Sequence, residues 1–450
     1  MHRRQMLLLA GAPLAALGQT PPALKGDGQT DETAALQRWA DTRAPDFRLP
    51  PGRFRITRPI EIRLDRAGPL ALSGAEATLV MAGAGPALRI TGTHKGTAGP
   101  STVHEGVWRR ERTPLIDGLE IVGAHPEAGG IRLEGTMQAT FTRLVIRETR
   151  DAMVLTGRNR NVIVSECHIY NNRGPGILFD QLDLHQVNIA NCHISYNRRG
   201  GIVIRGGQIR NLQIGSCDIE GNMDPEGPPA ANVDIDTGAG AVREGAIIGC
   251  TLQHTKAAAG SANIRMVGQS AERAHRAGFF SIANNAFSDV GVNVHLRYAR
   301  GVVIAGNTFW EGKDANVLVE YSSDIVLSAN IMDRNPDYRD TESLGHVVFA
   351  DCRDVAVRGL HMQTTLHAEA ALVLRRCRRA EVSDTVLLNS QKAALLLDHS
   401  EGVRVSNCRM ENDAGEFVAL RVRGGRNNIV RGSLLAGTVD AEPGTATIER

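Results

Sequence analysis

Aromatic residues are scarce in this chain of 450 residues, where Phe, Trp and Tyr together make up 4%. A large globular core usually relies on aromatic side chains as anchors, so the composition argues against one conventional core. Glycine is abundant instead, with 48 residues. Small and aliphatic residues suit short strands joined by tight turns, and the composition therefore favours a repeat architecture.

An excess of charge of one sign is also missing. Basic and acidic residues number 51 and 49, which leaves a formal net charge of +2. Without a long basic run the chain is a poor candidate for nucleic-acid binding. The short basic segment 375–379 (RRCRR) is interpreted as a solvated turn.

The chain has no apolar run long enough to span a bilayer, which takes about 20 residues. The N-terminal run 6–17 is shorter and follows Arg3 and Arg4. It resembles a twin-arginine export signal of residues 1–18, cleaved near Gly18, although Met6 stands where Phe is common and no Ser or Thr precedes the arginines. An ordinary secretory signal is the alternative. Either signal predicts a periplasmic or secreted protein that leaves the membrane after cleavage.

Cysteine is present in an odd number, seven, which excludes a complete disulfide framework. Several cysteines instead belong to a repeated motif, apolar–x–x–(Cys/Asn)–x–apolar, seen at Cys167, Cys192 and Cys217 and again around Cys250, Asn285, Asn307, Asn330 and Cys408. We interpret this motif as an inward ladder, with Asn side chains bonding to one another and Cys as a small apolar filler. Metal binding is the alternative, but the CxxC pairing of zinc sites is absent.

A second motif shares the same period. It reads small/Asn–apolar–x–apolar–x and begins at Gly130, Ala152, Gly176, Gly201, Asn232, Asn263, Asn293, Asn316, His346, Ala371 and Ala394. The intervals are 22 to 25 residues, or 30 to 31 where a longer loop is expected. Stacked coils of this length predict a solenoid in which each coil buries the apolar side of short strands. The alternation places the second and fourth positions inside and the odd positions outside.

The segment before the coils adds to the fold assignment. The sequence from Gly26 to Gln37 reads as a turn and a capped helix with Thr30 or Asp31 as N-cap, and 49–56 (LPPGRFRI) reads as a turn into a strand. This opening resembles that of the pectin-lyase-like superfamily, and the whole chain looks like an exported β-helix repeat protein. The resemblance implies an all-β fold, a single right-handed parallel β-helix, with a cap at 19–57 and the helix domain at 58–450. It says little about activity.

The outward positions of four consecutive coils are polar. They carry Asp234, Asp236, Arg265, His295, Arg297 and Glu320, spread over roughly 15 Å at the strand spacing. Asn263, Asn293 and Asn316 begin three of these coils, and Tyr298 and Tyr321 follow two of them. Long segments at 222–231, 254–262 and 332–345 lie beside them and are expected to wall a groove.

A groove along a solenoid suits a linear polymer, so we expect a polysaccharide or oligosaccharide partner. Arg265 and Arg297 would bind substrate carboxylates, the asparagines sugar hydroxyls, and the tyrosines sugar faces. In a lyase, His295 would be the base. In a glycosidase, the acid and base or nucleophile would come from the carboxylates Asp234, Asp236 and Glu320.

The function expected is that of a polysaccharide lyase or glycoside hydrolase acting on an acidic glycan, with no cofactor. Calcium held by Asp234 and Asp236 is an option. A non-catalytic glycan-binding, structural or adhesive β-helix is the alternative, because mixed charges on a solenoid also pair across coils. The catalytic motifs of polygalacturonases and alginate epimerases are absent.

Overall fold

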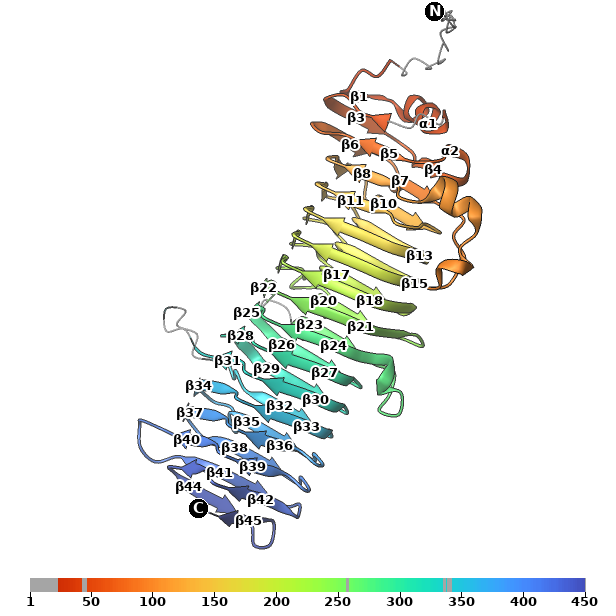
Figure 1. Ribbon diagram of the computed structural model, residues 1–450. Helices are drawn as coiled ribbons and strands as arrows, with labels where there is room; N and C mark the ends of the chain where they lie inside the picture. Colours follow the sequence, from red (N-terminus) through yellow and green to blue (C-terminus); the bar gives the residue numbers. More distant parts are fainter. Residues whose placement is uncertain (1–22, 43–46, 256–258, 335–336, 338–341, 450) are drawn as a thin grey trace, which may run out of the picture.

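The computed structural model describes residues 23–42, 47–255, 259–334, 337 and 342–449. These residues form one elongated solenoid whose axis runs from the N-terminal to the C-terminal end (Figure 1). The predicted export signal, 1–18, lies outside the described residues. No helix in the described part of the chain has the length and apolarity needed to cross a membrane.

Each coil contributes short strands to three columns, and the named strands pair in parallel with those of the next coil. The predicted right-handed parallel β-helix is confirmed. The first column contains β4 (Ile60–Arg63), β7 (Gly85–Thr91), β10 (Ala128–Glu134), β13 (Met153–Ser165), β15 (Ile177–Ala190), β17 (Ile202–Arg205), β20 (Ala231–Asp236), β23 (Ala262–Val267), β26 (Val290–Arg297), β29 (Gly312–Glu320), β32 (Val347–Ala350), β35 (Leu372–Arg375), β38 (Ala393–Asp398), β41 (Val418–Arg423) and β44 (Thr438–Ala441).

The second column follows a bend in each coil, and β13 and β15 continue through that bend. Its other strands are β2 (Phe47–Arg48), β5 (Ala71–Ser73), β8 (Leu115–Asp117), β11 (Thr140–Thr142), β18 (Gln208–Gly215), β21 (Ala241–Ile248), β24 (Ala277–Ala283), β27 (Arg300–Ala305), β30 (Ser323–Ser328), β33 (Arg353–Arg358), β36 (Glu381–Ser383), β39 (Arg404–Ser406), β42 (Asn428–Arg431) and β45 (Ala446–Glu449).

The third column is a separate sheet that closes each coil. Its strands are β1 (Asp27–Asp31), β3 (Gly52–Ile56), β6 (Ala77–Met81), β9 (Glu120–Gly123), β12 (Val145–Arg147), β14 (His168–Tyr170), β16 (His193–Ser195), β19 (Asp218–Glu220), β22 (Thr251–Gln253), β25 (Ala286–Phe287), β28 (Thr308–Phe309), β31 (Ile331–Met332), β34 (His361–Thr365), β37 (Val386–Ser390), β40 (Arg409–Glu411) and β43 (Leu434–Leu435).

The register of the first column follows the sequence repeat. Val233 pairs with Ile264, which pairs with Val294, and Val294 pairs with Val317. These second-position side chains are fully buried. The apolar interior is one continuous cluster from α1 to the last coils, because each coil can bury its inner side only against its neighbours.

Two polar ladders run inside this core. In the predicted one, the Cys250 N–H donates to Oδ1 of Asn285 (2.9 Å), and the series continues through Asn307 to Asn330. The seven cysteines are buried and free, as the small-filler interpretation requires. The ladder interpretation of this motif is confirmed.

The second ladder was not predicted. It begins at Asn172, Asn197 and Asn222, which lie in the turns after the third column, and continues within first-column strands through Asn232, Asn263, Asn293 and Asn316. Neighbouring amides lie 2.7 to 2.9 Å apart. In the early coils a glycine makes room for the turn asparagine, since a Cβ at Gly201 would meet Nδ2 of Asn222 at 2.9 Å.

Helix α1 (Thr33–Asp41) lies at the N-terminal end and packs Leu36 and Trp39 onto the core (Figure 1). Oδ1 of Asp31 accepts the N–H of Thr33 at 3.0 Å, although Glu32 is the residue in the N-cap position. β1 and β3 pair in the third column, so the expected cap region 19–57 already contributes strands. The short helices are α2 (Leu64–Ala67), η1 (Pro100–Thr102), η2 (Val107–Glu111) and η3 (Ala274–Arg276).

Candidate functional site

The outward side of β20, β23, β26 and β29 carries the polar residues expected from the sequence, and we call this surface the central face. Asp234 pairs in register with Arg265, and Arg265 pairs with His295. Arg297 pairs with Glu320. Residues 23 to 31 positions apart therefore become axial neighbours on one surface. This arrangement does not by itself assign a chemical role to any of these residues.

Asp234 and Arg265 form a bidentate ion pair. Nε of Arg265 lies 2.9 Å from Oδ1 of Asp234, and Nη2 lies 2.6 Å from Oδ2. Both side chains are 18% exposed. Burial alone would lower the pKa of Arg265, but the hydrogen bond and charge of Asp234 raise it above its ordinary value. Since this guanidinium already holds a carboxylate, its capacity for a second one is reduced.

His295 and Glu320 form the second pair of the central face. Nε2 of His295 lies 2.9 Å from Oε2 of Glu320, and the side chains are 22% and 28% exposed. A carboxylate on one ring nitrogen fixes the orientation of the imidazole, which is how general bases are commonly positioned. The ring is thus oriented and remains open to solvent.

Arg297, Tyr298 and Tyr321 form a stack at the carboxyl ends of β26 and β29. The two rings lie 5.3 Å apart, and the guanidinium carbon of Arg297 lies 5.1 and 5.6 Å from their centroids. The hydrogen bond to the Tyr298 hydroxyl and the charge of Glu320 raise the pKa of Arg297. Within the described residues Arg297 has no carboxylate in salt-bridge contact, so its charge is available to a ligand.

Asp236 is exposed at the end of β20, where its Oδ1 accepts the N–H of Gly238 at 2.8 Å. Asp234, its expected partner in calcium binding, has both oxygens bonded to Arg265. In the described part of the chain no three His, Cys, Asp or Glu residues group closely enough to hold a metal ion. The two oxygens of Asp234 are thus engaged by Arg265 rather than directed with Asp236 at a shared cation.

Asn263, Asn293 and Asn316 do not belong to the central face. Each is at most 3% exposed, and their amides bond along the internal ladder. The expectation that they bind sugar hydroxyls is wrong. They lie within first-column strands at a position where consecutive residues, such as Ala262, Asn263 and Ile264, are all buried, so the expected alternation of sides does not hold there.

The surroundings of the central face are polar on one side and apolar on the other. Segment 222–231 walls it as expected, since the Pro229 carbonyl oxygen accepts Nη2 of Arg265 at 3.3 Å. Parts of the other two expected walls, 254–262 and 332–345, lie outside the described residues. Beyond His295, the same outward column turns apolar with Leu318, Val348, Val373 and Leu396, which form a small cluster under nearby loops.

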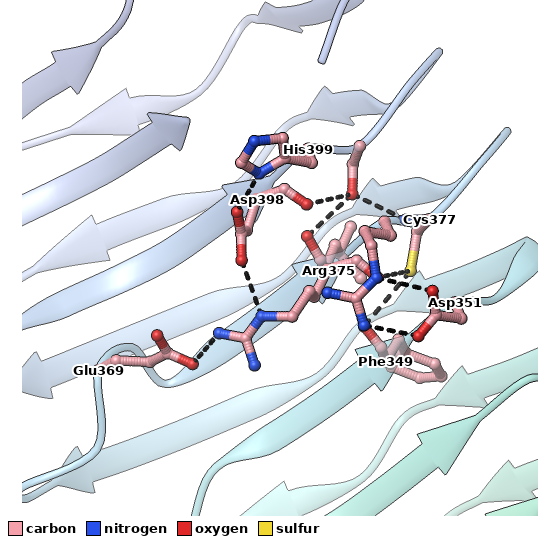
Figure 2. Close-up of polar contacts among 10 residues, drawn as sticks. Phe349, Asp351, Glu369, Arg375, Cys377, Asp398 and His399 are labelled. Atoms are coloured by element: carbon pink, nitrogen blue, oxygen red, sulfur yellow. Dashed lines mark hydrogen bonds and ion pairs between the residues drawn. The ribbon is translucent and has the colours of Figure 1, made fainter. Parts of the chain in front are cut away.

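A further charged network on the later coils was not singled out from the sequence (Figure 2). Arg375 bonds to Asp398 through Nε (2.7 Å) and to Glu369, and Nδ1 of His399 lies 2.6 Å from Asp398. Arg376 holds Asp351 in a bidentate pair. The sequence does contain an indication of this network, because arginines and acidic residues alternate at equivalent positions of neighbouring coils.

Ion pairs between an arginine and a carboxylate of the neighbouring coil recur over the outer surface of the solenoid. Examples outside the central face are Arg143–Asp117, Arg379–Asp354 and Arg426–Glu401. The Arg265–Asp234 pair belongs to this group. The central face differs from these other ion pairs because it also contains an oriented histidine, His295, beside Arg297, which has no carboxylate partner among the described residues.

Two family matches cover most of the coils. The family described as "Right handed beta helix region" matches residues 101–251, and that described as "Periplasmic copper-binding protein (NosD)" matches residues 242–407. No curated protein matches the sequence.

Solved structures resemble the chain at low sequence identity. The N-terminal fragment of bacteriophage Phi29 gene product 12 is 11% identical over 94% of this chain and 70% of its own, with a TM-score of 0.44. Tailspike protein 3 of bacteriophage CBA120 is 12% identical over 92% of this chain, which spans 57% of the tailspike, with a TM-score of 0.42. The A-module of Azotobacter vinelandii mannuronan C-5 epimerase AlgE4 is 10% identical over 92% of this chain and 97% of its own, with a TM-score of 0.40.

The parallel register of the coils and the two family matches agree on one assignment. This chain has the right-handed parallel β-helix fold that the first of these family models describes.

Proposed function

We propose that the protein acts on an anionic polysaccharide at the central face, cleaving it by β-elimination outside the cytoplasm. The observation that carries the proposal is the oriented His295–Glu320 pair, 2.9 Å apart, on the same side of β26 as Arg297. Residues i and i+2 of a strand are about 6.6 Å apart, which suits a base and a cation acting on one sugar ring.

In this reaction His295 takes the proton from the uronate carbon next to the carboxylate. The electron pair of that C–H bond forms a carbon–carbon double bond, the neighbouring carbon–oxygen glycosidic bond breaks, and the departing oxygen accepts a proton. Arg297 neutralises the uronate carboxylate, which makes the proton more acidic. Glu320 holds the imidazole in place through its contact with Nε2.

Hydrolysis by two carboxylates fits the central face less well. A glycosidase needs one carboxyl group that is protonated and able to donate. Both oxygens of Asp234 accept hydrogen bonds from the Arg265 guanidinium, so neither is free to contact a glycosidic oxygen. Glu320 is bonded to His295, which leaves Asp236 alone.

A non-catalytic glycan-binding surface is the second candidate. It is supported by the Arg297–Tyr298–Tyr321 stack, because an aromatic face beside a cation can bind an acidic sugar without any chemistry. The two candidates differ in whether the polymer is shortened.

The test is incubation with a panel of acidic and neutral polysaccharides, followed by measurement of ultraviolet absorbance from unsaturated uronates and of new reducing ends. Elimination raises both signals, and hydrolysis raises reducing ends alone. A binder retards the polymer in affinity electrophoresis and raises neither. Export is tested separately by fractionating cells that express the full chain and a variant in which Arg3 and Arg4 are both replaced by Lys.

A further inference from the structure

A hollow of about 310 Å³ lies next to the central face, at the turns that follow the first column. Tyr321 and Ser322 line it from one coil, Asp351 and Arg353 from the next, and Arg376 and Arg378 from the third. Ala271, from the loop between β23 and β24, closes one side. That loop projects from the edge of the sheet beside β24 (Figure 1).

The charge around the hollow is not balanced. Arg376 holds Asp351 with contacts of 2.7 and 2.6 Å, and Asp354 is shared between Arg379 and Arg353. With Arg378, four arginines stand against these two aspartates, so the turns carry a local excess of positive charge. The basic segment 375–379, interpreted from sequence as a solvated turn, thus lies at a concave surface.

Arg378 contributes half of this excess, and the other half comes from the two arginines that share Asp354. The Arg378 guanidinium has no hydrogen-bond or ion-pair partner in the described residues, and the acid within electrostatic reach, Glu401, is bonded to Arg426 at 2.7 Å. Arg353 pairs in register with Arg378 on the neighbouring coil. Like charges at directly opposite positions are unfavourable, and an anion between them removes that cost.

Tyr321 connects the hollow to the central face. Its ring stacks on Tyr298 beneath Arg297, and its side chain also lines the hollow. A polymer that crosses the tyrosines from His295 therefore arrives at Arg353 and Arg378. Arg378 can bind a carboxylate or sulfate in bidentate fashion, and Arg353, which gives one contact to Asp354, can add a further hydrogen bond; neutral sugars offer them no such partner.

We propose that this hollow is a second anion-binding subsite, which receives a carboxylate or sulfate group of the same polysaccharide through Arg353 and Arg378. The inference rests on the proposed function in taking a polymer as the ligand. With this subsite, the substrate is a chain with repeated negative charges. The chain runs across Tyr298 and Tyr321 toward the turns that follow β32 and β35. Arg376 and Arg379 remain bonded to their aspartates and support the site.

The test compares two double variants of the full chain by affinity electrophoresis and titration calorimetry. In one, Arg353 and Arg378 are both replaced by Gln; in the control, Arg404 and Arg431, two exposed arginines of β39 and β42, are replaced in the same way. Probes are polygalacturonate, dextran sulfate, neutral dextran and inorganic phosphate. Each experiment is repeated with His295→Ala added, so that binding is read without turnover. Thermal unfolding checks that both variants are folded.

We expect the Arg353/Arg378 variant to bind a polyanion about tenfold more weakly than the control, with a smaller dependence of affinity on salt. Equal losses in the two variants would mean general charge attraction and would overturn the subsite. So would a loss confined to inorganic phosphate, which would make a small free anion the ligand. Because binding is read without turnover, absence of cleavage would count against the proposed function and not against this subsite.

Discussion

Nε2 of His295 lies 2.9 Å from Oε2 of Glu320, although the strand register places His295 opposite Leu318. The contact is therefore diagonal: Glu320 reaches across from two positions further along β29. This geometry leaves Arg297, the register partner of Glu320, free to stack over Tyr298 and Tyr321. One carboxylate thus orients the imidazole while the neighbouring cation stays without a carboxylate partner.

Replacing Tyr321 by Ala should weaken polysaccharide binding. The variant removes the ring that supports Arg297 and joins the central face to the hollow, so Kd or KM should rise by about threefold to tenfold with a smaller change in kcat. Tyr196→Ala is the matched control, since that tyrosine is 54% exposed and lies away from the central face. Equal effects of the two substitutions would contradict the assignment of the stack.

Asp234→Asn should destabilise the protein. It leaves the mostly buried Arg265 guanidinium without its carboxylate, and we expect the free energy of unfolding to fall by about 1–3 kcal/mol. Asp117→Asn breaks the pair with Arg143, which is 63% exposed, and should cost no more than about 1 kcal/mol. Urea unfolding of the two variants measures the difference. A smaller loss for Asp234→Asn than for the control would show that burial of the pair contributes nothing.

Asn263→Ala tests the internal ladder. Asn263 donates to Oδ1 of Asn293 at 2.7 Å and to the Ser288 carbonyl at 3.1 Å, and it accepts from Asn232. Leaving these buried groups without partners should lower the free energy of unfolding by at least about 2 kcal/mol. The exposed Asn188→Ala should stay within about 0.5 kcal/mol of the parent. If folded Asn263→Ala bound substrate more weakly while its unfolding was unchanged, the sugar-binding role would be restored.

Acid should weaken the N-terminal turn through Asp27. The backbone N–H groups of Thr30 and Gln29 and the Thr30 hydroxyl, each 2.8 Å away, lower the pKa of Asp27 from 3.8 to about 2. Because the folded pKa is below the unfolded one, the stabilisation is complete above pH 3.8 and is lost as the pH falls toward 2.

The measurement for this turn is the thermal midpoint of the parent and of Asp27→Asn between pH 6 and pH 2. The parent should be the more stable at pH 6, and the difference should shrink over the acid range. A difference that is constant with pH would show that the carboxylate is not the group responsible.

Sequence alone was sufficient for the register of the first column, because inward residues such as Val233 and Ile264 repeat at a fixed place in every coil. That register also brought Asp234, Arg265 and His295 to one surface. The prediction failed for Asn263, because its neighbours Ala262 and Ile264 are buried as well and the alternation of inward and outward residues does not hold at this position. A hint was available: Gly176 and Gly201 occupy the same place in earlier coils, where the turn asparagines fill the space instead.

Which cation is available to a ligand could not be predicted from sequence. Arg265 and Arg297 both occupy outward positions of the repeat, yet Arg265 is held by Asp234 and Arg297 is not. Which arginine forms an ion pair depends on how far its side chain extends toward an acidic residue of the neighbouring coil. The hollow beside Tyr321 was missed for a similar reason, since the loop carrying Ala271 closes it from an earlier coil.

The most direct test of the central claim is turnover of the most responsive acidic polysaccharide by the parent, His295→Ala and His399→Ala. His399 also lies close to a carboxylate, that of Asp398, but away from the central face. Loss of at least about a hundredfold in kcat for His295→Ala, with unchanged thermal unfolding and with full activity of His399→Ala, is the predicted result. Full activity of folded His295→Ala would contradict a catalytic role for the central face.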